Sequence, residues 1–270
     1  GFIYPIQMGW QGGGGWLSTK GFSDFAGSTI VHACGGAAAL AGVIVLGARE
    51  GRFSSKGEKK SMVPFAASSI PLVTLGTFLL WFGWFGFNGF SQLAMGTFSD
   101  VNAITKIAVN THLAGAAGTV GGAVITRLML GKTDIVMMLN GALAGLVAIT
   151  AEPLTPSPIL AIFIGLIGSL IMYFGTKFLE NQKLDDVVGA IPVHMFAGIF
   201  GTLVVPLSNP ETNFGTQLTG VLSVCLFSFV LSYIVFKSLK QTIGLRISKE
   251  AEKLGTDKAE VGVVAYSIRD

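Results

Sequence analysis

Two histidines occur in matching sequence contexts and have the chemistry to move protons. His32 follows Asp24 by eight residues, and His194 follows Asp186 at the same spacing. Both segments read D-x-x-G-x-x-x-V-H, and each has a glycine four residues after the histidine. Imidazole donates and accepts hydrogen bonds and changes its charge near neutral pH. A pair of such groups could therefore guide a small polar molecule or pass a proton.

The elements that carry these histidines contain almost no charge. Of the 270 residues, 51% are hydrophobic and 12% are charged, about half the charged share of a typical soluble domain. The uncharged stretches are 25–48, 61–99, 107–126, 135–151, 153–176, 187–210 and 212–236. About 20 helical residues cross the hydrocarbon core of a bilayer. We predict an all-α, polytopic membrane helix bundle with seven spans, which argues against a soluble enzyme or a nucleic-acid partner.

The basic residues predict the orientation of this bundle. If the first loop is outside, only Lys20 and Lys106 of the 18 basic residues lie outside. The first inside loop alone carries Arg49, Arg52, Lys56, Lys59 and Lys60. Because inside loops are enriched in Lys and Arg, we expect a plasma or inner membrane protein whose N-terminal end here is outside and whose C-terminus is cytoplasmic.

This orientation makes the two Asp–His segments an inverted repeat. One segment enters from outside and the other from inside, as in transporters with a site near the midplane. Eight helical residues rise about 12 Å, so both imidazoles are expected near the centre of the membrane. Asp24 and Asp186 are predicted to be mainly structural, because a carboxylate at a helix start caps free N–H groups; Asp24 also adds negative potential at the outer mouth. His112 has no matching copy, and we expect a hydrogen-bonded packing role for it.

An aromatic stripe offers a candidate cation site. Trp84, Phe87 and Ser91 are spaced to share one helical face, with Trp81 and Asn88 flanking them. A hydroxyl beside aromatic faces can hold a small cation. A cation that enters an apolar pathway through the membrane has a large desolvation cost, whereas a weak acid can lose its proton and cross as a neutral molecule. The pattern therefore favours a small deprotonatable cation over Na⁺ or K⁺.

At these residues the chain resembles the ammonium transporter family, the Amt/MEP/Rh group. The resemblance is carried by DFAGSTIVHACGGAAALAGVIVLGAR (24–49), FGWFGFNGFSQL (82–93), LNGALAGLVAITA (139–151) and LDDVVGAIPVHMFAGIFGTL (184–203). It implies transport of ammonium or ammonia by a homotrimer of eleven-helix subunits. The seven spans here are similar to the last seven, so we expect about four spans to be absent from this sequence.

The resemblance also implies roles for single residues. The pore histidines of the family fall on His32 and His194, and a pore-lining aromatic falls on Trp84. The outer ammonium recruitment site falls on Ser91 and Phe87. No catalytic set or metal spacing accompanies them, so we expect no enzyme activity, no cofactor and no metal.

The chain departs from the family pattern at two positions. A further recruitment tryptophan of the family falls on Gly12, and Trp10, two residues earlier, is the candidate substitute. Phe90 stands where the family usually has a small residue.

The tail is similar to that of Amt proteins. Glu252, Gly255 and Asp257 form an E-x-x-G-x-D element, which in the family contacts neighbouring subunits and influences gating. PII-type regulators of the family bind the cytoplasmic face. We therefore divide the chain into a partial ammonium transporter membrane domain, 1–240, and a cytoplasmic regulatory tail, 241–270.

Two alternatives remain open on the same fold. A membrane ammonium sensor would account for the altered position at Gly12. A neutral gas channel of the Rh type would conduct ammonia or carbon dioxide without charge. The residues do not distinguish electrogenic from neutral transport.

Overall fold

The computed structural model describes residues 1–53 and 65–265. Lys56, Lys59 and Lys60, which we assigned to an inside loop, lie outside the described residues, as does the end of the predicted tail, 266–270. The elements are α1 (Ile3–Gln11), η1 (Gly12–Gly14), α2 (Trp16–Thr19), η2 (Ser28–Ala33), α3 (Cys34–Leu46), α4 (Ile70–Phe90), α5 (Phe98–Leu130), α6 (Ile135–Ile149), α7 (Pro158–Asn181), η3 (Ile191–Phe196), α8 (Ala197–Leu203), η4 (Val205–Leu207), α9 (Phe214–Thr242), α10 (Lys249–Leu254) and η5 (Asp257–Val261).

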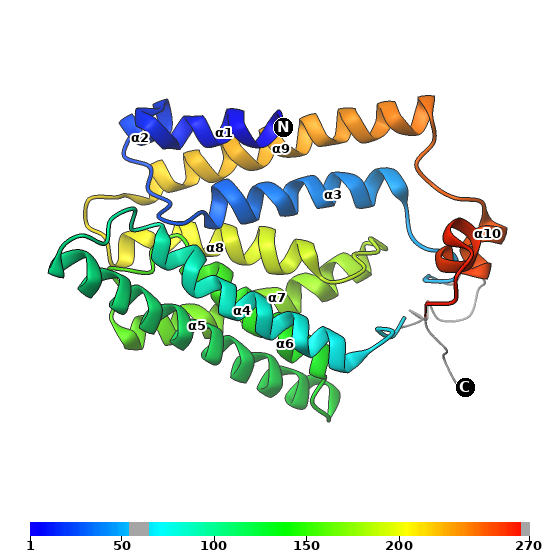
Figure 1. Ribbon diagram of the computed structural model, residues 1–270, viewed down its shortest axis with the longest axis horizontal. Coiled ribbons are helices and arrows are strands. Elements are labelled where there is room, and N and C mark those ends of the chain that lie inside the picture. Colours follow the sequence, from blue (N-terminus) through cyan, green and yellow to red (C-terminus); the bar gives the residue numbers. More distant parts are fainter. Residues whose placement is uncertain (54–64, 266–270) are drawn as a thin grey trace.

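The predicted all-α membrane bundle is confirmed. Five of the described helical segments are long and apolar enough to cross a membrane, and two shorter apolar ones cover Ile135–Ile149 and Ile191–Leu207. Each of these seven segments lies mainly in one uncharged stretch of the sequence, and three of them, Phe98–Leu130, Pro158–Asn181 and Phe214–Thr242, extend past it into charged residues. The long helices run along the long axis of the molecule, with α2 at one end and α10 at the other (Figure 1). We call these two ends the α2 end and the α10 end.

The long helices begin where a side chain can satisfy their first N–H groups. In α4, α5, α6, α7 and α9, an oxygen of the preceding residue accepts the backbone N–H three residues later; these N-cap residues are Ser69, Thr97, Asp134, Ser157 and Asn213. Such a cap replaces the partner that the first turn of a helix lacks. Polar residues, of which Asp134 alone is charged, therefore define where these five helices start.

Both histidines lie in π-helical turns. His32 is in η2, which continues into α3, and His194 is in η3, which continues into α8. The two segments pack against each other, η2 against η3 and α8, and η3 against α3. A π turn widens the helix locally and is frequent at functional sites. The inverted repeat thus brings two equivalent irregular turns together inside the bundle.

Candidate functional site

The structure brings His32 and His194 into direct contact. Their Nδ1 atoms are 3.2 Å apart, and their rings stack with centroids 5.2 Å apart and an interplanar angle of 17°. A contact of this length between two ring nitrogens requires one protonated and one unprotonated Nδ1. The His32 Nε2 atom is buried and has no hydrogen-bond partner among the described residues. The pair can therefore offer both a donor and an acceptor to a small molecule beside it.

The two aspartates cap the histidine segments. Asp24 accepts the backbone N–H groups of Thr29 and Ile30, both at 2.8 Å, and Asp186 accepts those of residues 189–191 at 2.7 to 3.1 Å. These bonds replace the missing intrahelical partners at each helix start. The structure thus gives both carboxylates the hydrogen bonds of the structural role that we predicted.

The glycine of each repeat has a conformation that other residues rarely adopt. Gly27 has a φ of 113° and Gly189 a φ of 78°. A side chain at a positive φ costs free energy, which glycine avoids. In both segments this turn leads the chain from the capping aspartate into the histidine helix, so the shared D-x-x-G pattern describes one local structure used twice.

An aromatic ring extends the histidine stack. The Trp84 ring stacks on His32 with centroids 5.0 Å apart and an angle of 13°, and its Nε1 donates to Thr150 Oγ1 at 2.9 Å. Phe87 lies 5.5 Å from the His32 ring and 5.9 Å from the Trp84 ring. The three rings Trp84, His32 and His194 therefore form one continuous stack, edged by Phe87, with an apolar cluster around Trp84.

The predicted recruitment residues are dispersed over two elements. Ser91 directly follows α4 as its C-cap residue, and its hydroxyl donates to the Phe87 carbonyl at 2.8 Å. Trp10 lies on α1, where its ring contacts Trp16 at 5.8 Å and Phe227 at 4.8 Å. A joint site of Trp10 with Ser91 stays a prediction.

His112 differs from our expectation. Its ring packs against Trp81, 5.6 Å away, and Phe85, 6.2 Å away, and its side chain is exposed. The expected hydrogen bond to His112 does not occur among residues 1–53 and 65–265. The reason is its position on α5, where the side chain is exposed and packs beside the aromatic rings of Trp81 and Phe85.

An ion pair connects the histidine segments at the α10 end. Arg49, three residues after α3, binds Asp185 through Nε at 2.7 Å and Nη2 at 2.8 Å, and its backbone N–H donates to the same carboxylate. Burial by itself raises the pKa of Asp185, but the hydrogen bonds from Arg49 and the charges of Arg49 and Arg52 outweigh it and hold the pKa below its usual value. Asp185 directly precedes the capping Asp186, so this pair holds the ends of both histidine segments.

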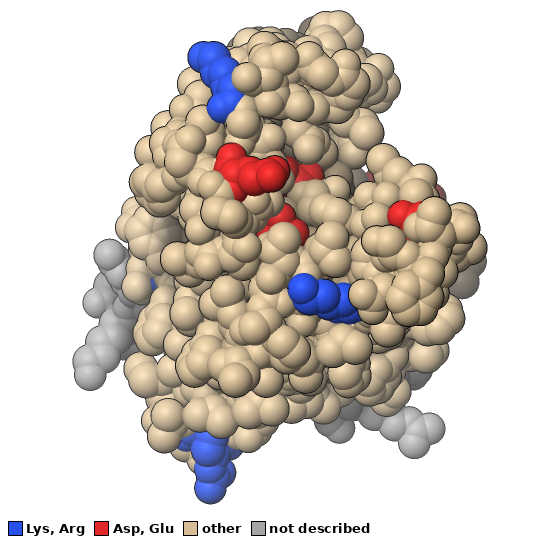
Figure 2. Space-filling model, turned by 90° about the vertical axis from the view of Figure 1, so that its left-hand side faces the viewer, with Lys and Arg blue, Asp and Glu red and all other residues tan. Residues whose placement is uncertain are grey.

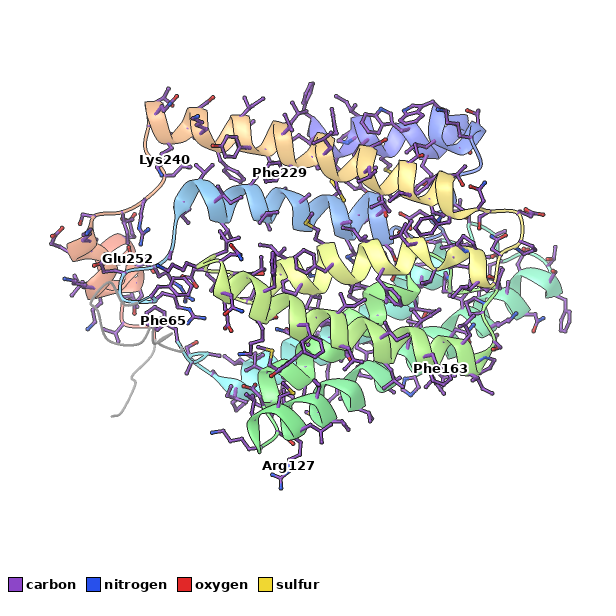
Figure 3. All side chains as sticks on the ribbon, turned by 180° about the vertical axis from the view of Figure 1, so that it is seen from behind. Phe65, Arg127, Phe163, Phe229, Lys240 and Glu252 are labelled. Carbon is purple, nitrogen blue, oxygen red and sulfur yellow. The ribbon has the colours of Figure 1, made fainter. Side chains whose placement is uncertain are left out.

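The tail folds onto the same end. Glu252 binds Arg246 with oxygen–nitrogen distances of 2.8 to 3.0 Å and accepts the Glu50 N–H at 2.8 Å. Figure 3 shows Glu252 on α10 at the same end of the molecule as Lys240 on α9. Gly255 has a φ of 98°, and Asp257 accepts the Ala265 N–H at 3.0 Å. The three residues of the E-x-x-G-x-D element therefore shape the tail and attach it to the loop after α3.

Several polar groups of the site were not predicted from the sequence. Thr150 anchors Trp84, the Arg49–Asp185 pair joins the two segments, and Gln217 contacts both. A signal did exist for some: Asp185 forms a doublet with Asp186, and Gln217 is the single glutamine in the uncharged stretch 212–236. The opposite, α2 end carries acidic side chains gathered near its middle, on a surface that is otherwise mainly uncharged (Figure 2).

This chain is similar in sequence to several known proteins. A sequence profile described as the Ammonium Transporter Family matches residues 1–266. Ammonium transporter Amt2 of Archaeoglobus fulgidus is 40% identical over 98% of this chain and 61% of its own length. Ammonium transporter Amt1 of Haloferax mediterranei is 36% identical over 98% of this chain and 55% of its own length. The chain therefore spans about three fifths of the length of such relatives.

Solved structures show the same fold. A structure titled Sensor Amt Protein superposes with a TM-score of 0.88 at 36% identity and covers 96% of this chain and 67% of its own. Candida albicans Mep2 superposes with a TM-score of 0.82 at 28% identity, over 96% of this chain and 60% of its own.

Proposed function

We propose a function from one premise: the chain belongs to the Ammonium Transporter Family. The relatives are named transporters rather than enzymes. In our proposal this chain supplies much of the pathway by which ammonium or ammonia crosses a plasma or inner membrane, with the Gly1 end outside and the tail in the cytoplasm.

One observation carries the proposal: the stacked pair His32–His194 lies in a membrane bundle with its Nδ1 atoms 3.2 Å apart. Asp, Glu, Lys and Arg are absent from the helical residues that carry the two histidines, 28–46 and 191–203. A cation entering such surroundings pays a large desolvation cost, whereas neutral ammonia does not. Ammonia carries three N–H donors and one lone pair, which match the acceptor and donor nitrogens of the two imidazoles.

The steps of transport follow from this chemistry. Ammonium is held near Ser91 and Phe87, with Trp10 as a further candidate contact, and loses its proton there. Ammonia then passes Trp84 and the His32–His194 stack. The proton either travels separately or stays behind, which leaves electrogenic and neutral transport as two forms of the same proposal.

The remaining expectations belong to the same proposal. Residues 1–240 form the membrane domain and residues 241–270 the regulatory tail, with Glu252, Gly255 and Asp257 as its key residues. The protein works as a homotrimer in the lipid bilayer, and a PII-type regulator binds the tail side. Asp24 adds negative potential at the mouth on the α2 end, where acidic side chains gather (Figure 2).

Replacing both histidines tests the proposal. In vesicles containing the intact protein, His32→Ala/His194→Ala should reduce ammonium flux, or reduce its selectivity over K⁺, because the pathway loses its polar groups. The matched control is His112→Ala, which removes an exposed imidazole outside the pair and should leave flux unchanged. Unchanged flux and selectivity in the double variant would reject the role of the pair.

A sensor is the second candidate, supported by the similarity to the structure titled Sensor Amt Protein. The flux measurement distinguishes the two. A sensor would bind ammonium, measurable by calorimetry with ammonium chloride, without passing it across the membrane. A gas channel of the Rh type would pass ammonia without current, as the neutral form of our proposal also does, and conductance of carbon dioxide would distinguish it.

A further inference from the structure

Gln217 joins the two histidine segments at the α2 end of the bundle. Its side chain is fully buried. Its Oε1 accepts the Ser23 N–H at 2.9 Å, and its Nε2 donates to the Ser23 carbonyl at 2.7 Å and to the Thr202 carbonyl at 3.0 Å. The amide therefore uses both of its N–H donors and its oxygen to hold two backbone segments that are far apart in sequence.

The two segments held by Gln217 are those that carry the histidines. Ser23 directly precedes the capping Asp24, and Thr202 lies eight residues after His194, near the end of α8. The hydroxyls of Thr29 and Thr202 are 2.6 Å apart and buried. We call Gln217, Thr29 and Thr202 the Gln217 clamp.

The helix that provides Gln217 lies outside the repeat. The matching segments are 24–36 and 186–198, whereas Gln217 is in the first turns of α9. A β-carbon added to Gly220, one turn further along α9, would stand 2.2 Å from the ring of the buried Phe22. This close approach places α9 within hydrogen-bonding distance of Ser23.

We propose that the Gln217 clamp is a positioning device: it fixes the axial register of the two histidine segments so that His32 and His194 meet. A hydrogen bond between two ring nitrogens weakens steeply when its distance or angle changes. A buried amide that loses its partners is costly, so the clamp favours one relative placement of the segments. Gln217 acts through the histidines and does not contact the transported molecule. This inference rests on the role proposed above for the histidine pair.

A double-mutant cycle in the intact protein tests it. Gln217→Leu removes all three hydrogen bonds and replaces the amide with an apolar side chain of similar size. In the wild-type background we expect ammonium flux relative to K⁺ to fall on the order of tenfold, because small misplacements of functional groups have large effects. In the His32→Ala/His194→Ala background the same change should alter this ratio by less than about twofold, since residues that act through one another are not additive.

A matched control and a second variant accompany the cycle. Thr219→Leu places the same side chain two residues along α9, where Thr219 is exposed and donates to the Gly215 carbonyl of its own helix, and should leave the flux ratio unchanged. If Gln217→Leu does not fold, judged by size-exclusion elution and circular dichroism, Thr29→Val/Thr202→Val replaces it. This pair removes the hydroxyl contact of the clamp and conserves side-chain shape.

The ¹⁵N resonances of the two imidazoles provide a second readout. This readout tests the inference even where the protein without the two histidines conducts too little ammonium for its flux to be measured. The Nδ1–Nδ1 contact predicts one protonated and one unprotonated Nδ1, and the clamp variant should lose this difference. Equal losses of flux ratio in both backgrounds, or unchanged imidazole resonances in a folded clamp variant, would overturn the inference. If the histidine substitutions alone change nothing, the proposed role of the pair fails first, and the clamp inference fails with it.

Discussion

Gly36 lies so close to Met195 that a β-carbon added to the glycine would stand 2.6 Å from the Met195 backbone nitrogen. The repeat has the same relationship in the other direction, because a β-carbon on Gly198 would stand 2.4 Å from the Ser28 carbonyl oxygen. Each glycine follows its histidine by four residues and faces the segment of the other histidine. These two contacts set how closely the histidine segments approach.

Gly36→Ala and Gly198→Ala should therefore destabilise the protein. Added atoms in a packed interior cost about 1–3 kcal/mol, and here the nearest atoms belong to backbone that cannot turn aside. Gly35→Ala is the control, since an added β-carbon there meets nothing within 4 Å. Thermal unfolding in detergent should show lower midpoints for Gly36→Ala and Gly198→Ala and no loss for Gly35→Ala; equal midpoints for all three would contradict the close approach.

Loss of a capping aspartate should also reduce stability. Asp186→Ala removes the acceptor for the N–H groups of residues 189–191, and a lost cap costs about 0.5–2 kcal/mol. Asp24→Ala should cost more, because Asp24 is only 1% exposed and its partners would be left unpaired in the interior. Denaturant unfolding of both variants measures the difference, and a larger effect for Asp186→Ala would show that burial does not control the cost.

The Arg49–Asp185 pair predicts an acid-sensitive contact. Despite burial, which opposes ionisation, the arginine contacts hold the pKa of Asp185 below its usual value of 3.8. Its folded pKa is lower than its unfolded pKa, so the pair stabilises the fold above about pH 4 and loses this contribution as the pH falls through the folded pKa. Melting temperatures should be measured between about pH 6 and about pH 2.5. As the pH is lowered, they should fall less steeply for Asp185→Asn than for wild type. Parallel curves would exclude Asp185 as the group responsible.

The indole anchor of the aromatic stack should be measurable by a double-mutant cycle. Trp84→Phe and Thr150→Val each break the 2.9 Å bond between Trp84 Nε1 and Thr150 Oγ1. A buried hydrogen bond contributes about 1 kcal/mol, and an unpaired buried donor costs more. The double variant should be more stable than the sum of the single losses predicts. Strict additivity would mean that the two groups do not interact.

The contact of the tail with the loop after α3 predicts protection of one amide. Glu252 accepts the Glu50 N–H, and this bond, together with the hydrogen bonds from Arg246, holds the pKa of Glu252 below its usual value. Glu252→Ala should increase hydrogen exchange at Glu50 and in residues 246–254. Glu250→Ala, a change on the same short helix, serves as the control; similar exchange in both variants would argue against a specific role for Glu252.

The amino-acid sequence alone determined the class of the protein and its repeat. The spacing of charges predicted seven apolar helical segments, because a charge in the hydrocarbon region is costly whatever the packing around it. The D-x-x-G-x-x-x-V-H pattern identified His32 and His194, because capping and left-handed turns are local structures that depend on nearby residues. These features can be read from the sequence since their physical causes act within one helix.

Only the tertiary structure decided which groups meet. The hydrogen bonds of Gln217 to Ser23 and of Arg49 to Asp185 join residues that are 194 and 136 positions apart. Nothing in the local pattern around these residues encodes such pairings, because they depend on the register and rotation of whole helices. The same reason packs Trp10 against Phe227 and places His112 beside the Trp81 ring. The sequence thus identified the histidines, whereas packing brought their nitrogens to within 3.2 Å.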